Sequence, residues 1–432
     1  MTDAPGPEPG PRRRWPLWLA LGLVALVLSC AVPLVVIVTL RDHGPGAAAS
    51  ASPIAVHSPE PGDPEQTTQL WLRERIAEVL TQQAGALLRG DERGFLAVAE
   101  PKSAAVGALR RQFRSLRALK VTAWQVRITD IPDRVGSRWR VAVTYEHCFV
   151  DPGCLTGPVS IETTWVDRAG VPRMVALAPS PSAQDGPRPW EASDLVVAVG
   201  KRAVVATTAG QKRHLAEVLR EAERAAEVAD RYAVGGRPPR HYQIFYAGEA
   251  EWRRWYGGDR PEWTAGYAVP VGGGHFDVVL NSKGLHVSVL DDLLRHEMTH
   301  AASLPSGGYR TGTNWWLVEG IADLAAAGGR PVSRYESLGD VRRLVSGGWQ
   351  GPLSTAEPGQ RATDWQVSAA YGVGYLAVRH LVDRFGEQAM LAFFKAVVHE
   401  RKSPEAASTE IFGEPWQALQ DDCVSYVRSA AS

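Results

Sequence analysis

The chain has 432 residues, of which 45% are hydrophobic and 22% are charged. This composition is ordinary for a globular protein, and the length predicts two folded domains rather than one core. Lysine plus arginine and aspartate plus glutamate each total 47, so the formal net charge is zero. Because the sequence has neither a basic excess nor an acidic tail, no nucleic-acid partner is predicted.

The N-terminal region predicts a membrane anchor. Residues 1–14 are rich in proline and glycine and are predicted to form a disordered cytoplasmic tail. Residues 15–41 contain an uncharged apolar run that, at ~1.5 Å per residue, is long enough as a helix to cross a ~30 Å hydrocarbon core. Three arginines precede this run and one follows it, which predicts a single-pass signal anchor in the cell membrane with an extracytoplasmic C-terminal part. The alternatives are a cleaved signal peptide and a lipoprotein signal ending at Cys30.

A small α+β domain is predicted at residues 67–178, after a flexible linker at 42–66 that is rich in Ala, Ser and Pro. Helical periodicity marks 67–90 and 103–119, and alternation marks strands at 121–130, 138–149, 159–166 and 171–178. Two helices followed by an antiparallel sheet resemble the NTF2-like domains in order. A spacer or a partner-binding module is the simplest role, and its partner is unknown.

One cysteine pair lies inside this domain. Cys148 and Cys154 flank a strong turn signal, Asp-Pro-Gly at 151–153. In an exported domain, this spacing predicts a short disulfide across a hairpin loop. Zinc binding by the pair is the weaker alternative, because no histidine or second cysteine pair lies at ligand spacing.

A second linker, 179–193, is rich in Pro and Ser and leads to a domain at 194–432. Strands are predicted at 195–199, 202–206, 241–247, 266–271 and 276–280, with a long helix at 212–232. The remainder is predicted to be mainly helical.

The first group of candidate catalytic and metal-binding residues is an HExxH sequence at 296–300. On a helix, His296 and His300 lie on one face at i and i+4, so both imidazoles can reach one metal ion. Alone, the pattern also occurs by coincidence on surface helices. Glu319 and Asp323 lie in a second helical stretch, again at i and i+4.

Two imidazoles and the Glu319 carboxylate predict a three-ligand Zn²⁺ site with an open fourth position, where a bound water is acidified to a pKa of about 7. Glu297, next to the first histidine, is predicted to act as the general base toward that water. Asp323 is predicted to accept a hydrogen bond from a ligand imidazole and to fix its tautomer.

Together, HEMTH and WWLVEGIAD resemble the gluzincin (thermolysin-like) group of metallopeptidases, specifically the bacterial peptidase MA-like domains, over about residues 195–428. The resemblance implies a mixed sheet above an active-site helix, a helical lower lobe, and cleavage of peptide bonds by a zinc-bound water. The segment YGVGYL at 371–376 matches a tyrosine-bearing helix found in such proteins.

By this resemblance, Tyr371, or else Tyr375, donates a hydrogen bond to the oxyanion of the tetrahedral intermediate. Aromatic packing is the alternative for either ring. The strand containing Gly266, Tyr267 and Ala268 lies where these folds place a sheet edge that pairs with extended substrate. A plain core strand has the same pattern.

The sequence therefore predicts a membrane-anchored extracytoplasmic zinc metallopeptidase that acts on peptides or proteins. The alternative is a tethered binding or scaffold protein whose peptidase-like lobe is catalytically silent. The complete set of ligands, base and second carboxylate favours the enzyme, since decayed sites usually lose one of them.

Overall fold

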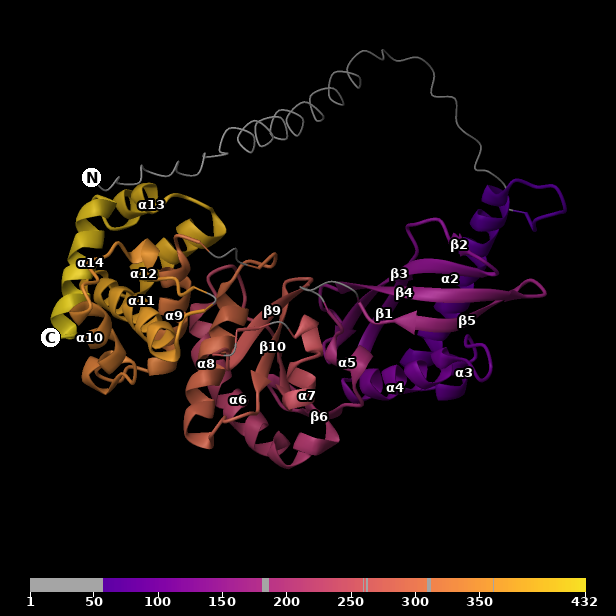
Figure 1. Ribbon diagram of the computed structural model, residues 1–432, viewed down its shortest axis with the longest axis horizontal. Helices are drawn as coiled ribbons and strands as arrows, with labels where there is room; N and C mark the ends of the chain where they lie inside the picture. The colour runs from indigo at the N-terminus through magenta and orange to yellow at the C-terminus, as the bar shows by residue number, and fades with distance from the viewer. Residues whose placement is uncertain (1–56, 181–185, 259, 262, 309–311, 360) are drawn as a thin grey trace, which may run out of the picture. The chain divides into compact units, whose positions relative to one another are not determined.

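The computed structural model describes residues 57–180, 186–258, 260–261, 263–308, 312–359 and 361–432 (Figure 1). One compact unit extends over Ser58–Ser432. It contains both helices and strands, in agreement with the α+β content predicted from the sequence. The predicted cytoplasmic tail, the predicted anchor and most of the first linker lie outside the described residues.

The prediction of a membrane-spanning helix is wrong for the described chain. None of its helices combines the length and the apolar character needed to cross a bilayer. The two longest, Glu65–Arg89 and Asp364–Phe385, contain charged side chains such as Arg75 and Arg379, and charges within a span are costly. This finding overturns the transmembrane part of the predicted fold and the single-pass membrane localisation derived from it. Residues 15–41, on which both rested, lie outside the described chain.

The N-terminal part of this unit, from Glu65 to Ala178, packs three helices against an antiparallel sheet and is called the small domain below. The helices are α2 (Glu65–Arg89), α3 (Glu92–Leu96) and α4 (Ala104–Ala118). The strands are β1 (Val121–Arg127), β2 (Asp133–Val135), β3 (Arg138–Phe149), β4 (Gly157–Arg168) and β5 (Val171–Ala178). Their order is β1-β3-β4-β5, with β2 also paired to β3. Leu72, Ile76, Leu80 and Leu87 recur at helical spacing on α2, and all are at most 1% exposed.

A mixed five-stranded sheet forms the centre of the second domain. Its strands are β6 (Val196–Val199), β7 (Ala203–Thr207), β8 (Tyr242–Ala247), β9 (Gly266–Gly272) and β10 (His275–Asn281), in the order β6-β7-β8-β10-β9. The pairs β7–β8 and β8–β10 are parallel, and β9 pairs antiparallel with β10. Strand β9 is therefore an edge strand within the described chain.

Helices surround this sheet and continue beyond it. The short helices α5 (Pro189–Ala192) and α7 (Glu249–Trp252) and the longer α6 (Leu215–Ala229) and α8 (Val287–Ser303) accompany the strands. The lower lobe contains α9 (Trp315–Ala327), α10 (Leu338–Ser346), α11 (Asp364–Phe385), α12 (Glu387–Phe394), α13 (Pro404–Ile411) and α14 (Trp416–Ala430). Helix α8 contacts α6, β9 and β10 on one side and α9 on the other (Figure 1).

The two faces of the mixed sheet have different partners. Val204 and Ala206 of β7 belong to the same hydrophobic core as the buried residues of the small domain. Ala203 and Val205, their alternating neighbours, pack with α6 and α8. Between the domains, Trp190 of α5 is 1% exposed and belongs to the first of these cores. The small domain thus covers one face of the sheet whose other face supports α8.

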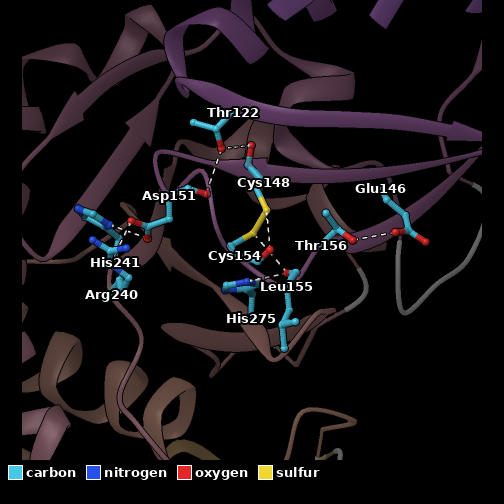
Figure 2. The surroundings of a disulfide bond; sticks show 10 residues. All are labelled: Thr122, Glu146, Cys148, Asp151, Cys154, Leu155, Thr156, Arg240, His241 and His275. Atoms are coloured by element: carbon cyan, nitrogen blue, oxygen red, sulfur yellow. Dashed lines mark hydrogen bonds and ion pairs between the residues drawn. A yellow bond between two sulfur atoms is a disulfide. The ribbon is translucent and has the colours of Figure 1, made fainter. Parts of the chain in front are cut away.

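A disulfide-closed loop also joins the two domains. Cys148 and Cys154 are bonded across the β3–β4 connection. Asp151, inside this loop, accepts a hydrogen bond of 2.8 Å from Nδ1 of His241, just before β8 (Figure 2). The backbone carbonyl of Leu155 accepts a hydrogen bond of 2.9 Å from Nε2 of His275, at the start of β10. The segment that follows the disulfide therefore contacts the protein where the turn between β9 and β10 ends.

The buried imidazole of His147, next to this loop, should make the stability of the protein depend on pH. Burial lowers the pKa of its imidazole from 6.5 to about 3, and Nδ1 has no hydrogen-bond partner in the described chain. Below pH 6.5 the unfolded chain therefore binds a proton that the folded chain does not, so stability falls as the pH falls toward 3. Between pH 7.5 and 5 this group should remove about 2 kcal/mol from the free energy of unfolding.

Urea denaturation at both pH values checks this expectation. The His147→Phe variant keeps a ring of similar size and should lose about 2 kcal/mol less than the parent over that interval. An equal loss in both proteins would contradict the assignment.

Candidate metal centre

Two neighbouring helices bring four polar side chains to one point. His296 and His300 lie one turn apart on α8, and Glu319 and Asp323 lie one turn apart on α9. Both histidines are buried, with 9% and 8% of their surface exposed. Because α8 and α9 pack against each other, the histidine face of one meets the carboxylate face of the other.

Three of these residues present donor atoms to a common centre. Nε2 of His296 and Nε2 of His300 are 3.1 Å apart, and each is 3.2 Å from Oε2 of Glu319. Three atoms held about 2.1 Å from one tetrahedral zinc ion would be about 3.4 Å apart. The observed triangle therefore has nearly the size that such an ion requires, and these three side chains form a possible metal-binding group.

The hydrogen bond to Asp323 strengthens this fit. Nδ1 of His296 is 2.8 Å from Oδ1 of Asp323, and a carboxylate accepts, so the proton of the neutral imidazole lies on Nδ1. Nε2 is then a lone pair aimed at Glu319, which is also an acceptor. Either a second proton on the imidazole or a metal ion can lie between two such acceptors. The donor set suits a zinc ion, and the contact of His296 with Asp323 is compatible with the role predicted for Asp323.

Tyr335 extends this chain of contacts outward. Its hydroxyl donates to Oδ2 of Asp323 at 2.5 Å, and its ring stacks on Tyr375 with the centroids 4.1 Å apart. Asp323 is therefore held from both sides, by the imidazole of His296 and by this phenol. No sequence motif marks Tyr335, which lies in the segment beyond the end of α9.

Glu297 lies beside the triangle and is 4% exposed. A methyl group added to Gly266 of β9 would come within 2.8 Å of Oε1 of Glu297. A side chain at this position would press on the carboxylate of Glu297 unless that group moved. The edge strand and the carboxylate are thus in direct contact.

Two neighbouring carboxyl groups have opposite pKa shifts. Burial raises the pKa of Glu297, against the lowering effect of the two histidines. Burial also acts to raise the pKa of Glu319, but His300 and His296 outweigh it and hold that pKa below its ordinary value. A carboxyl with a raised pKa suits proton transfer, whereas one with a lowered pKa stays ionised as a ligand does.

The two tyrosines of α11 lie in different environments. The ring of Tyr371 is 5.8 Å from that of His296 and 5.0 Å from that of Trp315. Burial and the nearby carboxylates raise its pKa well above 10, so the phenol keeps its proton. Tyr375 is fully buried and stacks on Tyr335. Of the two, Tyr371 is the phenol whose ring lies near that of His296.

The predicted substrate strand lines the same centre. Gly266, Tyr267 and Ala268 border a cavity of about 570 Å³ together with the histidines and Glu319. The backbone edge of β9 away from β10 has no partner strand among the described residues. Trp263 and Trp315, which the sequence analysis did not assign to the site, line this cavity too.

Two glycines allow α9 and α11 to approach closely. A methyl group added to Gly320 would come 2.4 Å from the carbonyl oxygen of Gly374. One added to Gly374 would come 2.7 Å from the carbonyl oxygen of Trp316. Because Gly320 follows Glu319, this approach helps to set the position of the carboxylate. Tyr371 lies one turn before Gly374 and is positioned by the same contact.

The solved structures that are similar to this chain include two structures of one yeast enzyme and one of a bacterial protein. Native yeast LTA4 hydrolase matches with a TM-score of 0.36 and 17% identity, over 52% of this chain and 38% of that one. The same yeast enzyme in complex with bestatin matches with a TM-score of 0.35 and 16% identity, over 53% and 38%. A mutant M1 zinc metallopeptidase from Deinococcus radiodurans matches with a TM-score of 0.33 and 17% identity, over 62% and 59%.

The aligned region spans less than two thirds of each of these chains. No protein-family model and no curated protein matches the sequence. Structural similarity at these TM-scores is too distant to indicate what the chain does, so the resemblance to the peptidase MA-like group stays a prediction from its two motifs. The function must be argued from the geometry of the site.

Proposed function

We propose that the protein is a zinc-dependent metallopeptidase that hydrolyses peptide bonds. The observation that carries the proposal is the triangle formed by His296, His300 and Glu319, with sides of 3.1 and 3.2 Å. A zinc ion held there would act as a Lewis acid on a water molecule or a carbonyl group at the open position.

The remaining residues have roles that follow from their positions. Glu297 is buried beside the triangle, where a carboxylate can take a proton from the attacking water and pass it to the departing amine. Tyr371 keeps its proton, so it can donate a hydrogen bond to the negative charge that develops on the substrate carbonyl, a contribution of about 3 kcal/mol. The free edge of β9 can hold an extended peptide by backbone hydrogen bonds.

Metal analysis and peptide cleavage with the full-length protein and its Glu297→Gln variant test the proposal. We expect close to one zinc ion per chain in both proteins, because Glu297 is not one of the three donors. Cleavage of a peptide library should fall by about 10²–10⁴-fold in the variant, the usual contribution of general acid–base catalysis.

Equal cleavage by both proteins would refute the role of Glu297, and protein without zinc would refute the metal site. Zinc at full occupancy with no cleavage by the parent would instead support the silent scaffold.

A second measurement examines how Asp323 is held. The Tyr335→Phe variant keeps the stacked ring but removes the hydroxyl that donates to Asp323. Loss of groups that orient metal ligands costs 10–100-fold in affinity, and for this more distant group we expect about tenfold weaker zinc binding.

Competition with a chromophoric chelator measures this affinity. Tyr426→Phe on α14 is the control, since the ring of Tyr426 stacks on His380 rather than on the site, and it should bind zinc as the parent does. Unchanged affinity in Tyr335→Phe would show that Asp323 is positioned without the phenol.

A further inference from the structure

The cleft at the metal centre continues along α8 on both sides of the reactive residues. On the side of the helix N-terminus, a cavity of about 310 Å³ is lined by Leu285, Val289 and Leu293. On the side of its C-terminus, the cavity of about 570 Å³ reaches Leu304, Gly307 and Gly308. Both cavities are lined by His296, Glu297 and Tyr371. The reacting centre therefore lies between two spaces and not at the closed end of one.

The length of this cleft can be compared with that of a peptide. Val289 and Leu304 are 15 residues apart, and a helix that rises ~1.5 Å per residue covers roughly 22 Å over that distance. An extended peptide rises ~3.3 Å per residue, so about six or seven residues fit. Glu297 lies near the middle of the interval, which leaves room for about three residues on either side of the bond to be cut.

The edge strand provides a matching backbone surface. Strand β9 spans Gly266–Gly272 and lines the cavity at the C-terminal end of α8 with five consecutive residues, from Gly266 to Pro270. At its other end, Ala265 and Gly266 also line the cavity at the N-terminal half of the helix. The strand thus runs past the reacting centre, so a bound chain can continue beyond it.

A chain end would need a fixed opposite charge close to the reacting centre. Three carboxylates near the reacting centre already have other roles. Glu297 is the proposed base, Glu319 belongs to the triangle, and Asp323 accepts hydrogen bonds from His296 and Tyr335. Asp292, which lines the 310 Å³ cavity, is paired with Arg330 at 2.6 Å. Neither member of that pair is a free counter-charge for a terminal amine or carboxylate. Arg260, a cation that lines the 570 Å³ cavity, lies over the ring of Tyr267, with its Cζ 4.3 Å from the ring centroid.

From the two-sided cleft we infer that the protein is an endopeptidase, which binds an extended stretch of polypeptide across α8 and cuts it at an internal bond. This inference rests on the proposed peptidase function and names its substrate class. Water adds across the scissile amide: its oxygen becomes bonded to the carbonyl carbon, the carbon–nitrogen bond breaks, and the amine leaves with the proton.

The inference can be tested with a library of ten-residue peptides. Each peptide is prepared in two forms, one with free ends and one with an acetylated N-terminus and an amidated C-terminus. With the full-length protein, mass spectrometry should find the same internal cuts in both forms. Rates should agree within about fivefold, because exposed terminal charges contribute at most about 1 kcal/mol.

Loss of single residues from one end of the free peptides, with the blocked peptides intact, would overturn the inference and leave the peptidase proposal standing. Cleavage of neither form would overturn both.

A variant that narrows one side of the cleft provides a second test. Val289 lines the 310 Å³ cavity and is 37% exposed, so Val289→Trp should fill part of that space without entering the core. We expect cleavage of blocked ten-residue peptides to slow by about tenfold, since the lost contacts lie on one side of the cut. Val199→Trp, a change of equal size at a 40% exposed residue of β6, is the control and should leave the rate unchanged. Unchanged cleavage by Val289→Trp would show that this side of the cleft does not hold substrate.

Discussion

The Glu319→Ala variant should lose zinc affinity by more than about 100-fold, above the range caused by removing groups that only orient ligands. Glu319 supplies one of the three donor atoms, and its Oε2 is 3.2 Å from Nε2 of each histidine. Without it, two imidazoles remain to hold the ion, and the negative charge that balances Zn²⁺ is lost. Metal content after dialysis and competition with a chelator measure the effect.

Glu357→Ala is the matched control for the change in charge. Burial and the charge of Glu319 raise the pKa of Glu357, which places this exposed carboxylate within electrostatic reach of the site. Its removal should change zinc affinity by less than about fivefold, because exposed charges interact weakly. Far-UV circular dichroism shows whether both variants are folded. A folded Glu319→Ala protein that binds zinc as tightly as the parent would refute the ligand assignment.

The Gly320→Ala variant should be less stable than the parent by about 1–3 kcal/mol, the usual cost of overpacking. The added methyl group meets the backbone carbonyl of Gly374 at 2.4 Å, so α9 and α11 must separate. Alanine is a better helix former by about 1 kcal/mol, which opposes but does not cancel this cost. Because Glu319 is the preceding residue, zinc binding should weaken as well.

Gly107→Ala on α4 is the control, since a methyl group there meets nothing within 4 Å. It should raise the free energy of unfolding by about 0.5–1 kcal/mol. Urea denaturation of the two variants measures both changes. A gain in stability in Gly320→Ala would mean that the two helices are not held by this contact.

Local patterns were sufficient for much of the fold. Alternation of apolar residues predicted the strands around β3, β4, β8 and β10 to within a few residues, because one or both faces of each strand are buried. Likewise, the spacing of four residues within α8 and within α9 showed which side chains share a face. The short elements α3 and β2 went unpredicted, since five and three residues are too few to show a period.

Contacts between distant segments could not be predicted in this way. The bond from Tyr335 to Asp323 joins a loop to a helix, and no local pattern requires it. The glycines at 320 and 374 look like ordinary helix-weakening residues until the two helices are placed together. The membrane-spanning helix expected from hydropathy is not found among the helices of the described residues.

The shared core also limits which motions can open the cleft. Moving the small domain away from the sheet would expose Val204, Ala206 and Trp190 to water, at about 25 cal/mol for each Å² of apolar surface. The small domain, the sheet and α8 should therefore move as one rigid body. The lower lobe has a second core, which includes Ile321 and Leu376 and which Tyr232, just after α6, also joins. A hinge between α8 and α9 is thus the cheaper way for the cleft to admit a polypeptide, and it would separate Glu319 from the histidines whenever the cleft opens.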